Sequence, residues 1–265
     1  MAASKLTKTE AIVIKSMKYR DTSKIVTFYT RRFGKLKGIA KGARRSDNKF
    51  GSSLEPMSHV ALVLYKKEHR DLHLISQCDS IRSFGKIHDS IEKISAGLSI
   101  LELVDQLAQE EEENPALFSL LLDTMAALDE GSRNILSFRR AFQIRFAALL
   151  GYAPSLDHCS VCGKSLLENE EQSTMGFQLL NGAIICSQCR ETGKLRSGVG
   201  YTAISPPALQ LLRRFLSSRT ESISTFVYNE RIGNELDETL RLYLRYHFEN
   251  MRDLKSTQVF RSIIQ

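Results

Sequence analysis

The chain from Ser23 to Gly42 reads SKIVTFYTRRFGKLKGIAKG. Its first run, 23–30, is rich in β-branched and aromatic residues, as strands are, and a turn at 31–34 follows it. Between Lys35 and Ala40 basic and apolar residues then alternate, which is the two-residue period of a strand with one buried face. Gly38 in this second run permits the close backbone approach that a small barrel requires. The stretch therefore predicts two adjoining strands of a closed sheet.

Similar short runs lie on both sides of this stretch, at 10–16, 58–65 and 72–78. Together they make five short strands separated by turn residues, which is typical of a small barrel such as an OB-fold. We therefore expect residues 1–82 to form an OB-fold domain that binds nucleic acid.

Beyond Phe84 the apolar residues recur at helical spacing. The acidic run Glu110–Glu113 interrupts this pattern, and we interpret it as a solvated loop or helix end. Further helices are predicted from Asn114-Pro115, after Ser132 as far as Leu150, and near the end of the chain. We expect an α+β multidomain protein with a helical bundle in two parts, 83–150 and 200–265, and an inserted zinc-ribbon-like module at 151–199.

The charge of the 265-residue chain is unevenly distributed. Its formal net charge is +7, but residues 1–82 hold 18 Lys and Arg against 7 Asp and Glu. Such a basic domain indicates a polyanionic partner, although a general solubility charge would look the same. The sequence contains neither an apolar run long enough to span a membrane nor a signal peptide, so we expect a cytoplasmic protein that binds no membrane.

Four of the five cysteines form two Cys-x-x-Cys pairs, and an Asn181-Gly182 hairpin signal lies between the pairs. Zinc prefers four thiolates in a tetrahedron, and four thiolates leave no open position for catalysis. We therefore predict a structural Zn²⁺ site; a redox dithiol pair and unrelated cysteines are the alternatives. The predicted ligands are Cys159, Cys162, Cys186 and Cys189.

A dense group of cations follows the turn at 31–34 and continues into the next loop. Single-strand binders combine such a charged groove with rings that stack on bases, although a solvated barrel face would also carry these charges. Nearby rings at Phe28, Tyr29, Phe33 and Phe50 are expected to lie mostly in the core. The candidate DNA-binding residues are Lys35, Lys37, Lys41, Arg44, Arg45 and Lys49.

Sequence signals for catalysis are missing. Gly163-Lys164-Ser165 resembles the end of a phosphate-binding loop, but His158 occupies the position of the required first glycine. We therefore predict a binding protein with no catalytic residues. The alternative is a nucleic-acid-modifying enzyme that acts on RNA or DNA and carries a zinc ribbon.

Several segments, in order along the chain, resemble the bacterial recombination mediator family RecO. They are Glu10–Ile14, Lys24–Thr30, Phe33–Lys35, Gly38–Arg45, Leu54–Pro56, Arg140–Phe142 and Leu149–Pro154, which runs into the first cysteine pair. The resemblance implies an OB-fold, a helical domain and a zinc module. It also implies binding and annealing of single-stranded DNA, contact with double-stranded DNA, and association with the nucleoid.

The resemblance further implies three protein partners. These are RecR, the recombinase RecA as a functional link, and the acidic C-terminal tail of single-strand-binding protein. A receptor for that tail needs cations beside an apolar pocket. The helix Ser132–Leu150 offers Phe138, Phe142 and Phe146 on one stripe, with Arg139, Arg140 and Arg145 nearby, and we name these arginines as candidates. If the aromatic residues are core instead, we expect the arginines to form a solvated rim.

Overall fold

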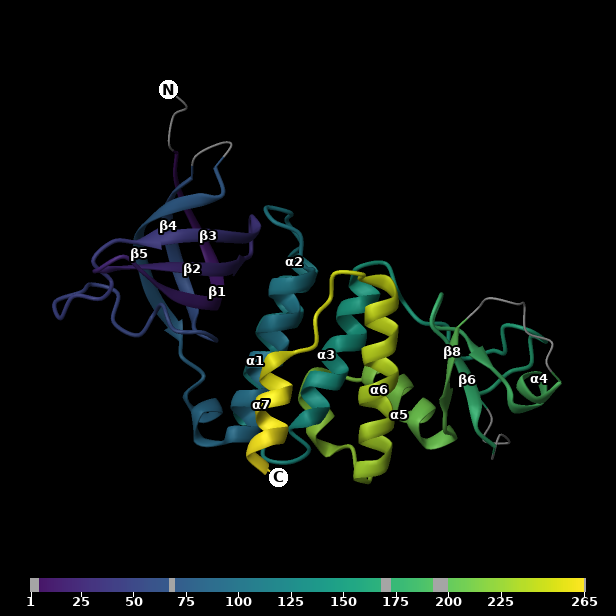
Figure 1. Cartoon of the computed structure of the whole chain (residues 1–265). Coiled ribbons are helices and arrows are strands. Elements are labelled where there is room, and N and C mark those ends of the chain that lie inside the picture. Colours follow the sequence, from purple (N-terminus) through teal and green to yellow (C-terminus); the bar gives the residue numbers. More distant parts are fainter. Residues whose placement is uncertain (1–4, 67–69, 168–172, 193–199, 265) are drawn as a thin grey trace. The chain divides into compact units, whose positions relative to one another are not determined.

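The computed structural model describes residues 5–66, 70–167, 173–192 and 200–264. The chain divides into two compact units (Figure 1). The barrel unit comprises Met1–Glu130 and Leu254–Gln265, and the cysteine unit comprises Gly131–Asp253. These boundaries lie elsewhere than those expected from the sequence, because the first two helices group with the barrel and the later helices group with the cysteines. None of the helices in the described residues is both long and apolar enough to cross a membrane.

Five strands of the barrel unit form a closed barrel in the order β1-β2-β3-β5-β4, with β1 also pairing with β4. Every pairing is antiparallel except that of β3 with β5. This arrangement confirms the predicted OB-type barrel. The strands are β1 (Lys5–Tyr19), β2 (Ser23–Thr30), β3 (Gly34–Ala40), β4 (His59–Lys66) and β5 (Leu72–Arg82).

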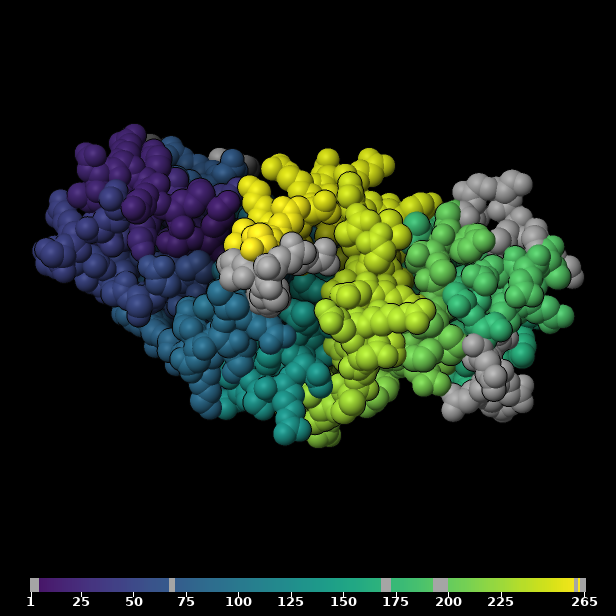
Figure 2. Space-filling model, turned by 60° about the horizontal axis from the view of Figure 1, so that its bottom comes forward, coloured from purple at the N-terminus to yellow at the C-terminus, as the bar shows by residue number. Residues whose placement is uncertain are grey.

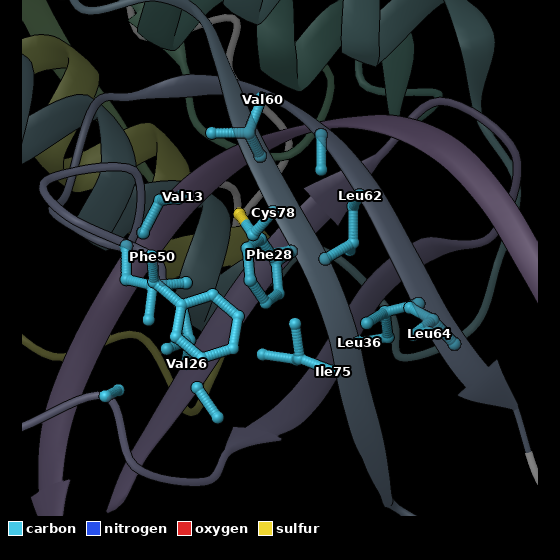
Figure 3. Packing of buried hydrophobic residues seen from close by; sticks show 14 residues of the cluster. Val13, Val26, Phe28, Leu36, Phe50, Val60, Leu62, Leu64, Ile75 and Cys78 are labelled. Atoms are coloured by element: carbon cyan, nitrogen blue, oxygen red, sulfur yellow. The ribbon is translucent and has the colours of Figure 1, made fainter. Parts of the chain in front are cut away.

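The alternation seen in the sequence fills the interior of this barrel. Val26 and Phe28 of β2 and Leu36 of β3 point inward, while Phe50 enters from the loop that follows β3 (Figure 3). Tyr29 is also buried, on the other side of β2. Of the four rings considered for base stacking, only Phe33 is partly exposed.

Three α-helices complete the barrel unit: α1 (Ile91–Leu107), α2 (Pro115–Glu130) and α7 (Lys255–Ile264), with a short 3-10 turn η1 (Gly85–Asp89) before them. The Asn114 side chain caps α2 by accepting from the Leu117 backbone N–H at 2.9 Å. α7 returns from the far end of the chain to lie beside α1 (Figure 1). Glu102 of α1 accepts from the backbone N–H groups of Lys255 and Ser256, so it caps α7.

The acidic run 110–113 is an exposed loop between α1 and α2, as expected, but it also lies along β3. The Glu111 backbone N–H donates to the Lys35 carbonyl at 2.9 Å. Gly34 has a φ of +59°, and a Cβ there would lie 1.9 Å from the Glu112 carbonyl oxygen. The segment thus depends on a glycine and on cations that are far away in the sequence.

The cysteine unit combines helices with a small sheet of order β7-β6-β8. Gly182 has a φ of +63° in the turn before β7, a left-handed conformation that glycine adopts readily. The helices and the inserted four-cysteine module match the predicted fold class. The elements are α3 (Leu136–Leu149), β6 (Met175–Gln178), β7 (Ile184–Ile185), α4 (Ser187–Glu191), β8 (Tyr201–Ile204), α5 (Pro206–Ser217), the 3-10 turn η2 (Thr220–Thr225) and α6 (Glu230–His247).

Candidate metal centre and nucleic-acid interface

The four predicted zinc ligands converge on one point of the cysteine unit. Cys159 and Cys162 come from the turn before β6, while Cys186 and Cys189 come from the start of α4. Their four Sγ atoms lie within 4.8 Å of one another, and Cys162 Sγ is 3.9 Å from Cys186 Sγ. Zinc–sulfur bonds of about 2.3 Å in a tetrahedron place sulfur atoms about 3.8 Å apart. This geometry could hold a metal ion and is consistent with zinc.

Backbone N–H groups point at the sulfur atoms. Cys159 Sγ accepts from Val161 and Cys186, at 3.4 and 3.3 Å, and Cys186 Sγ accepts from Cys189 at 3.4 Å. Burial raises the pKa of Cys159, but hydrogen bonds from the backbone outweigh it and lower that pKa to about 7. The thiolate is the form that binds a metal ion, so these N–H groups favour Cys159 as a ligand, whereas burial raises the pKa of Cys186 and Cys189.

The fifth cysteine has a different environment. Cys78 lies in the barrel core, where burial raises its pKa to about 11. A buried, protonated thiol of this kind is an inert core residue.

The two lysines of β3 are engaged within the barrel unit. Lys35 is only 7% exposed, its Nζ donates to the Asp105 carbonyl at 2.7 Å, and burial lowers its pKa. Lys37 is more exposed, but its Nζ is 2.5 Å from a carboxylate oxygen of Glu110. Binding of DNA at these two lysines stays a prediction, and it would require the acidic run to move.

The other four predicted cations are exposed on the loop between β3 and β4. The Arg44 backbone N–H donates to Thr22 and its side chain donates to the Arg20 carbonyl, so the loop lies against the turn between β1 and β2. In the space-filling view the residues of this barrel form one continuous purple-to-blue surface (Figure 2). Lys41 and Arg45 make no ion pair with any residue that the structure describes.

Two further cations reach this end of the barrel, and the sequence analysis did not single them out. Lys18 and Arg20 are exposed at the end of β1 and in the turn that follows. Lys18 also lies opposite Lys24 of β2, and only the strand register reveals this position. We name the hairpin-end surface by its members: Lys18, Arg20, Lys41, Arg44, Arg45 and Lys49.

The arginines of α3 are not a solvated rim. Arg139 and Arg140 are each 5% exposed. Asp237 of α6 accepts from Arg139 at 2.6 Å and from two nitrogens of Arg140 at 2.8 Å. The expectation of exposed guanidinium groups is therefore wrong for this pair, because both form buried ion pairs with a carboxylate that is distant in the sequence.

Arg145 has backbone partners in the same unit. Its side chain donates to the carbonyls of Phe215 and Ser218 and to the Thr220 hydroxyl. The aromatic stripe beside it, Phe138, Phe142 and Phe146, is core. Docking of an acidic tail on this helix stays a prediction, and such a tail would have to displace these partners.

Fold and site together define a class of protein: an OB-type barrel with helices and an inserted four-cysteine module. Two family models match the chain, "Recombination protein O N terminal" over residues 1–84 and "Recombination protein O C terminal" over residues 88–258. The chain belongs to the RecO family. This membership does not favour the alternative of a nucleic-acid-modifying enzyme.

Similar proteins, each called DNA repair protein RecO, come from several bacteria. That of Pelotomaculum thermopropionicum is 32% identical, over 95% of this chain and 92% of the relative. Those of Syntrophus aciditrophicus and Chloroherpeton thalassium are 32% and 30% identical, each over 97% of this chain and over 95% and 98% of the relative. The similarity thus extends over both units.

Proposed function

We propose that this protein acts in DNA repair by binding single-stranded DNA on its barrel and annealing complementary strands. The hairpin-end surface carries this proposal, since six cations gather there on an OB-type barrel and none of them pairs with a described carboxylate. Phosphate contacts by such cations supply binding that tolerates any sequence. Two complementary strands held by one basic protein repel each other less, so they pair faster.

In the cell, annealing would belong to recombinational repair at the nucleoid. The family resemblance supports a mediator that acts with RecR and helps to load RecA onto DNA coated with single-strand-binding protein. Double-stranded DNA, the product of annealing, would bind the same cations, because they contact phosphates and do not read bases.

We also propose that the four cysteines hold one zinc ion with a structural role. Four thiolates complete a tetrahedral shell and leave no position for a reactive water. The ion would hold the turn before β6 against α4 and so join two segments that are distant in the sequence.

The hairpin-end surface can be tested with the double variant Lys41→Ala/Arg45→Ala, because these two side chains are exposed and lack ion pairs. For single-stranded DNA, the slope of log affinity against log salt should fall by about 1.4, since each lost phosphate contact contributes about 0.7. Affinity should fall equally for all sequences, and annealing without ATP should slow.

The matched control is Arg133→Ala/Arg231→Ala, which removes two exposed cations from the cysteine unit. This control should leave the slope unchanged. An unchanged slope in the Lys41/Arg45 variant, with its fold intact, would contradict the proposed DNA surface.

A further inference from the structure

A second group of cations surrounds a hollow at the other end of the barrel. The hollow has a volume of about 260 Å³ and is lined by Lys5, Leu6, Thr7, Lys8, Arg32, Phe33 and Lys66. We call it the Phe33 groove. A neighbouring hollow of about 350 Å³ shares Lys8 and Arg32, so the groove continues along β1 and β4. None of these residues is among those singled out for the hairpin-end surface.

Positive charges lie close to one another in the Phe33 groove. Lys5 of β1 lies directly opposite Lys66 of β4 in the strand register, and like charges in this position destabilise a sheet. The Arg32 guanidinium carbon and the Lys66 Nζ lie 5.3 and 5.8 Å from the centre of the Phe33 ring. An anion bound in the groove would relieve this repulsion.

Among the described residues, one carboxylate makes an ion pair with a cation of the Phe33 groove, and Glu10 lines the neighbouring hollow, where it pairs with Arg31. The Glu111 Oε2 atom lies 2.5 Å from Lys66 Nζ. Lys5, Lys8 and Arg32 make no ion pair with a described residue, although Arg32 donates to the Lys8 carbonyl at 3.2 Å. Within the described ranges, three of these four cations therefore have no counter-charge.

The groove also offers apolar surface beside its cations. Leu6 is half exposed, and Phe33 packs on the barrel core with part of its ring uncovered. Cations for phosphates next to apolar side chains for bases are what a single strand of nucleic acid requires. The two basic groups lie at opposite ends of β2, whose eight residues span roughly 26 Å at about 3.3 Å per residue.

We infer that the Phe33 groove is a second binding site, which takes the phosphodiester backbone of a second DNA strand while the hairpin-end surface holds the first. This inference rests on the proposed function and deepens it, because annealing needs two strands on one protein. Each strand would bind to its own basic surface, and one protein would thus hold both strands before they pair.

The test compares wild type with Lys5→Glu/Lys8→Glu, and uses Arg133→Glu/Arg231→Glu as a control with the same charge change. Strands of about four thymidines, near the smallest site size of an OB-fold, are too short to fill both surfaces. Native mass spectrometry at low ionic strength counts the strands bound per chain. We expect two strands on wild type and on the control, and one on the groove variant.

Annealing of longer complementary strands provides the second readout. It should slow by about tenfold or more in the groove variant, as expected when electrostatic attraction of one strand is lost. Two strands on the groove variant, or one on wild type, would overturn the inference. The inference would also be overturned if the groove bound polyglutamate and the groove variant bound as many DNA strands as wild type. The ligand of the groove would then be an acidic peptide.

Failure of the proposed function would look different. In that case Lys41→Ala/Arg45→Ala would leave DNA binding unchanged, whatever the groove variant does. The two pairs of substitutions therefore report separately on the two surfaces.

Discussion

Asp237 of α6 holds two guanidinium groups that the cysteine unit has buried. Burial by itself would raise the pKa of this carboxyl, but Arg139 and Arg140 hold it below its ordinary value. Arg140 also donates to the Tyr228 hydroxyl at 2.8 Å. Because a buried charge without its partner is costly, this group of residues should matter for the stability of the unit.

We predict that Asp237→Ala lowers the free energy of unfolding of the cysteine unit by about 3–5 kcal/mol, because it removes the carboxylate that two buried guanidinium groups share. Urea denaturation of the full chain measures this change. The control Glu238→Ala breaks an exposed pair with Arg241 and should cost about 0–1 kcal/mol. Equal losses for the two variants would show that Asp237 does not balance the arginines.

Sequence reasoning succeeded at residues whose chemistry is local. The spacing of the cysteines and the Asn-Gly turn between them predicted where the thiols gather, because each knuckle brings two of them together. It did not identify the ion-pair partner of Arg139 and Arg140, since Asp237 is 98 and 97 positions away along the chain. A helix-face argument places a side chain but does not identify what packs against it.

The acidic run 110–113 likewise combines a feature that is local in the sequence with contacts that are distant in it. The strands of the barrel follow from alternation within each run, and their turns from nearby glycines. The docking of the acidic run depends on Lys37, Lys66 and His73, which lie on three different strands. A charge run alone does not indicate which cations a closed barrel will bring to it.

This docking should depend on pH. Burial raises the pKa of Glu111, but Lys66 and His73 together bring it below its ordinary value of 4.5. A carboxyl with a depressed pKa in the fold stabilises the fold above its ordinary pKa, and this stability is lost as the pH falls through the lower value. We predict that acidification through this range exposes the Glu111 amide, whose hydrogen bond to Lys35 then opens.

Hydrogen exchange of that amide, followed by NMR as the pH is lowered and corrected for the intrinsic rate, measures the effect. Glu111→Gln should abolish the pH dependence, whereas Glu113→Gln should preserve it, because Glu113 makes no ion pair with a described residue. An amide that stays equally protected throughout the acid range would contradict the prediction.

For the whole molecule, the two units should respond separately to loss of metal. We predict that Cys162→Ser, or a strong chelator, removes the proposed zinc ion and loosens the segments around β6 and α4. Protection of the barrel amides should stay unchanged, because the barrel has its own core. Metal analysis and hydrogen-exchange mass spectrometry measure the two effects.

The fifth cysteine supplies the control for this experiment. Cys78→Ala should keep the metal and weaken the barrel, since it removes a buried core atom. If Cys162→Ser keeps a full complement of zinc, or if its loss loosens both units alike, the assignment of a separate structural site is wrong.

The return of α7 to α1 has a consequence for synthesis on the ribosome. The residues of β1 to α2 emerge first, and the whole of Gly131–Asp253 must follow before Lys255 and Ser256 can reach Glu102. Until then, the nascent chain carries a barrel and two helices whose third helix has not yet been made. Ser99 of α1 forms hydrogen bonds with Ser256 and Thr257. The polar face of α1 around Ser99 is therefore exposed to water until α7 has been made. Serines tolerate that delay where a purely apolar face would invite aggregation.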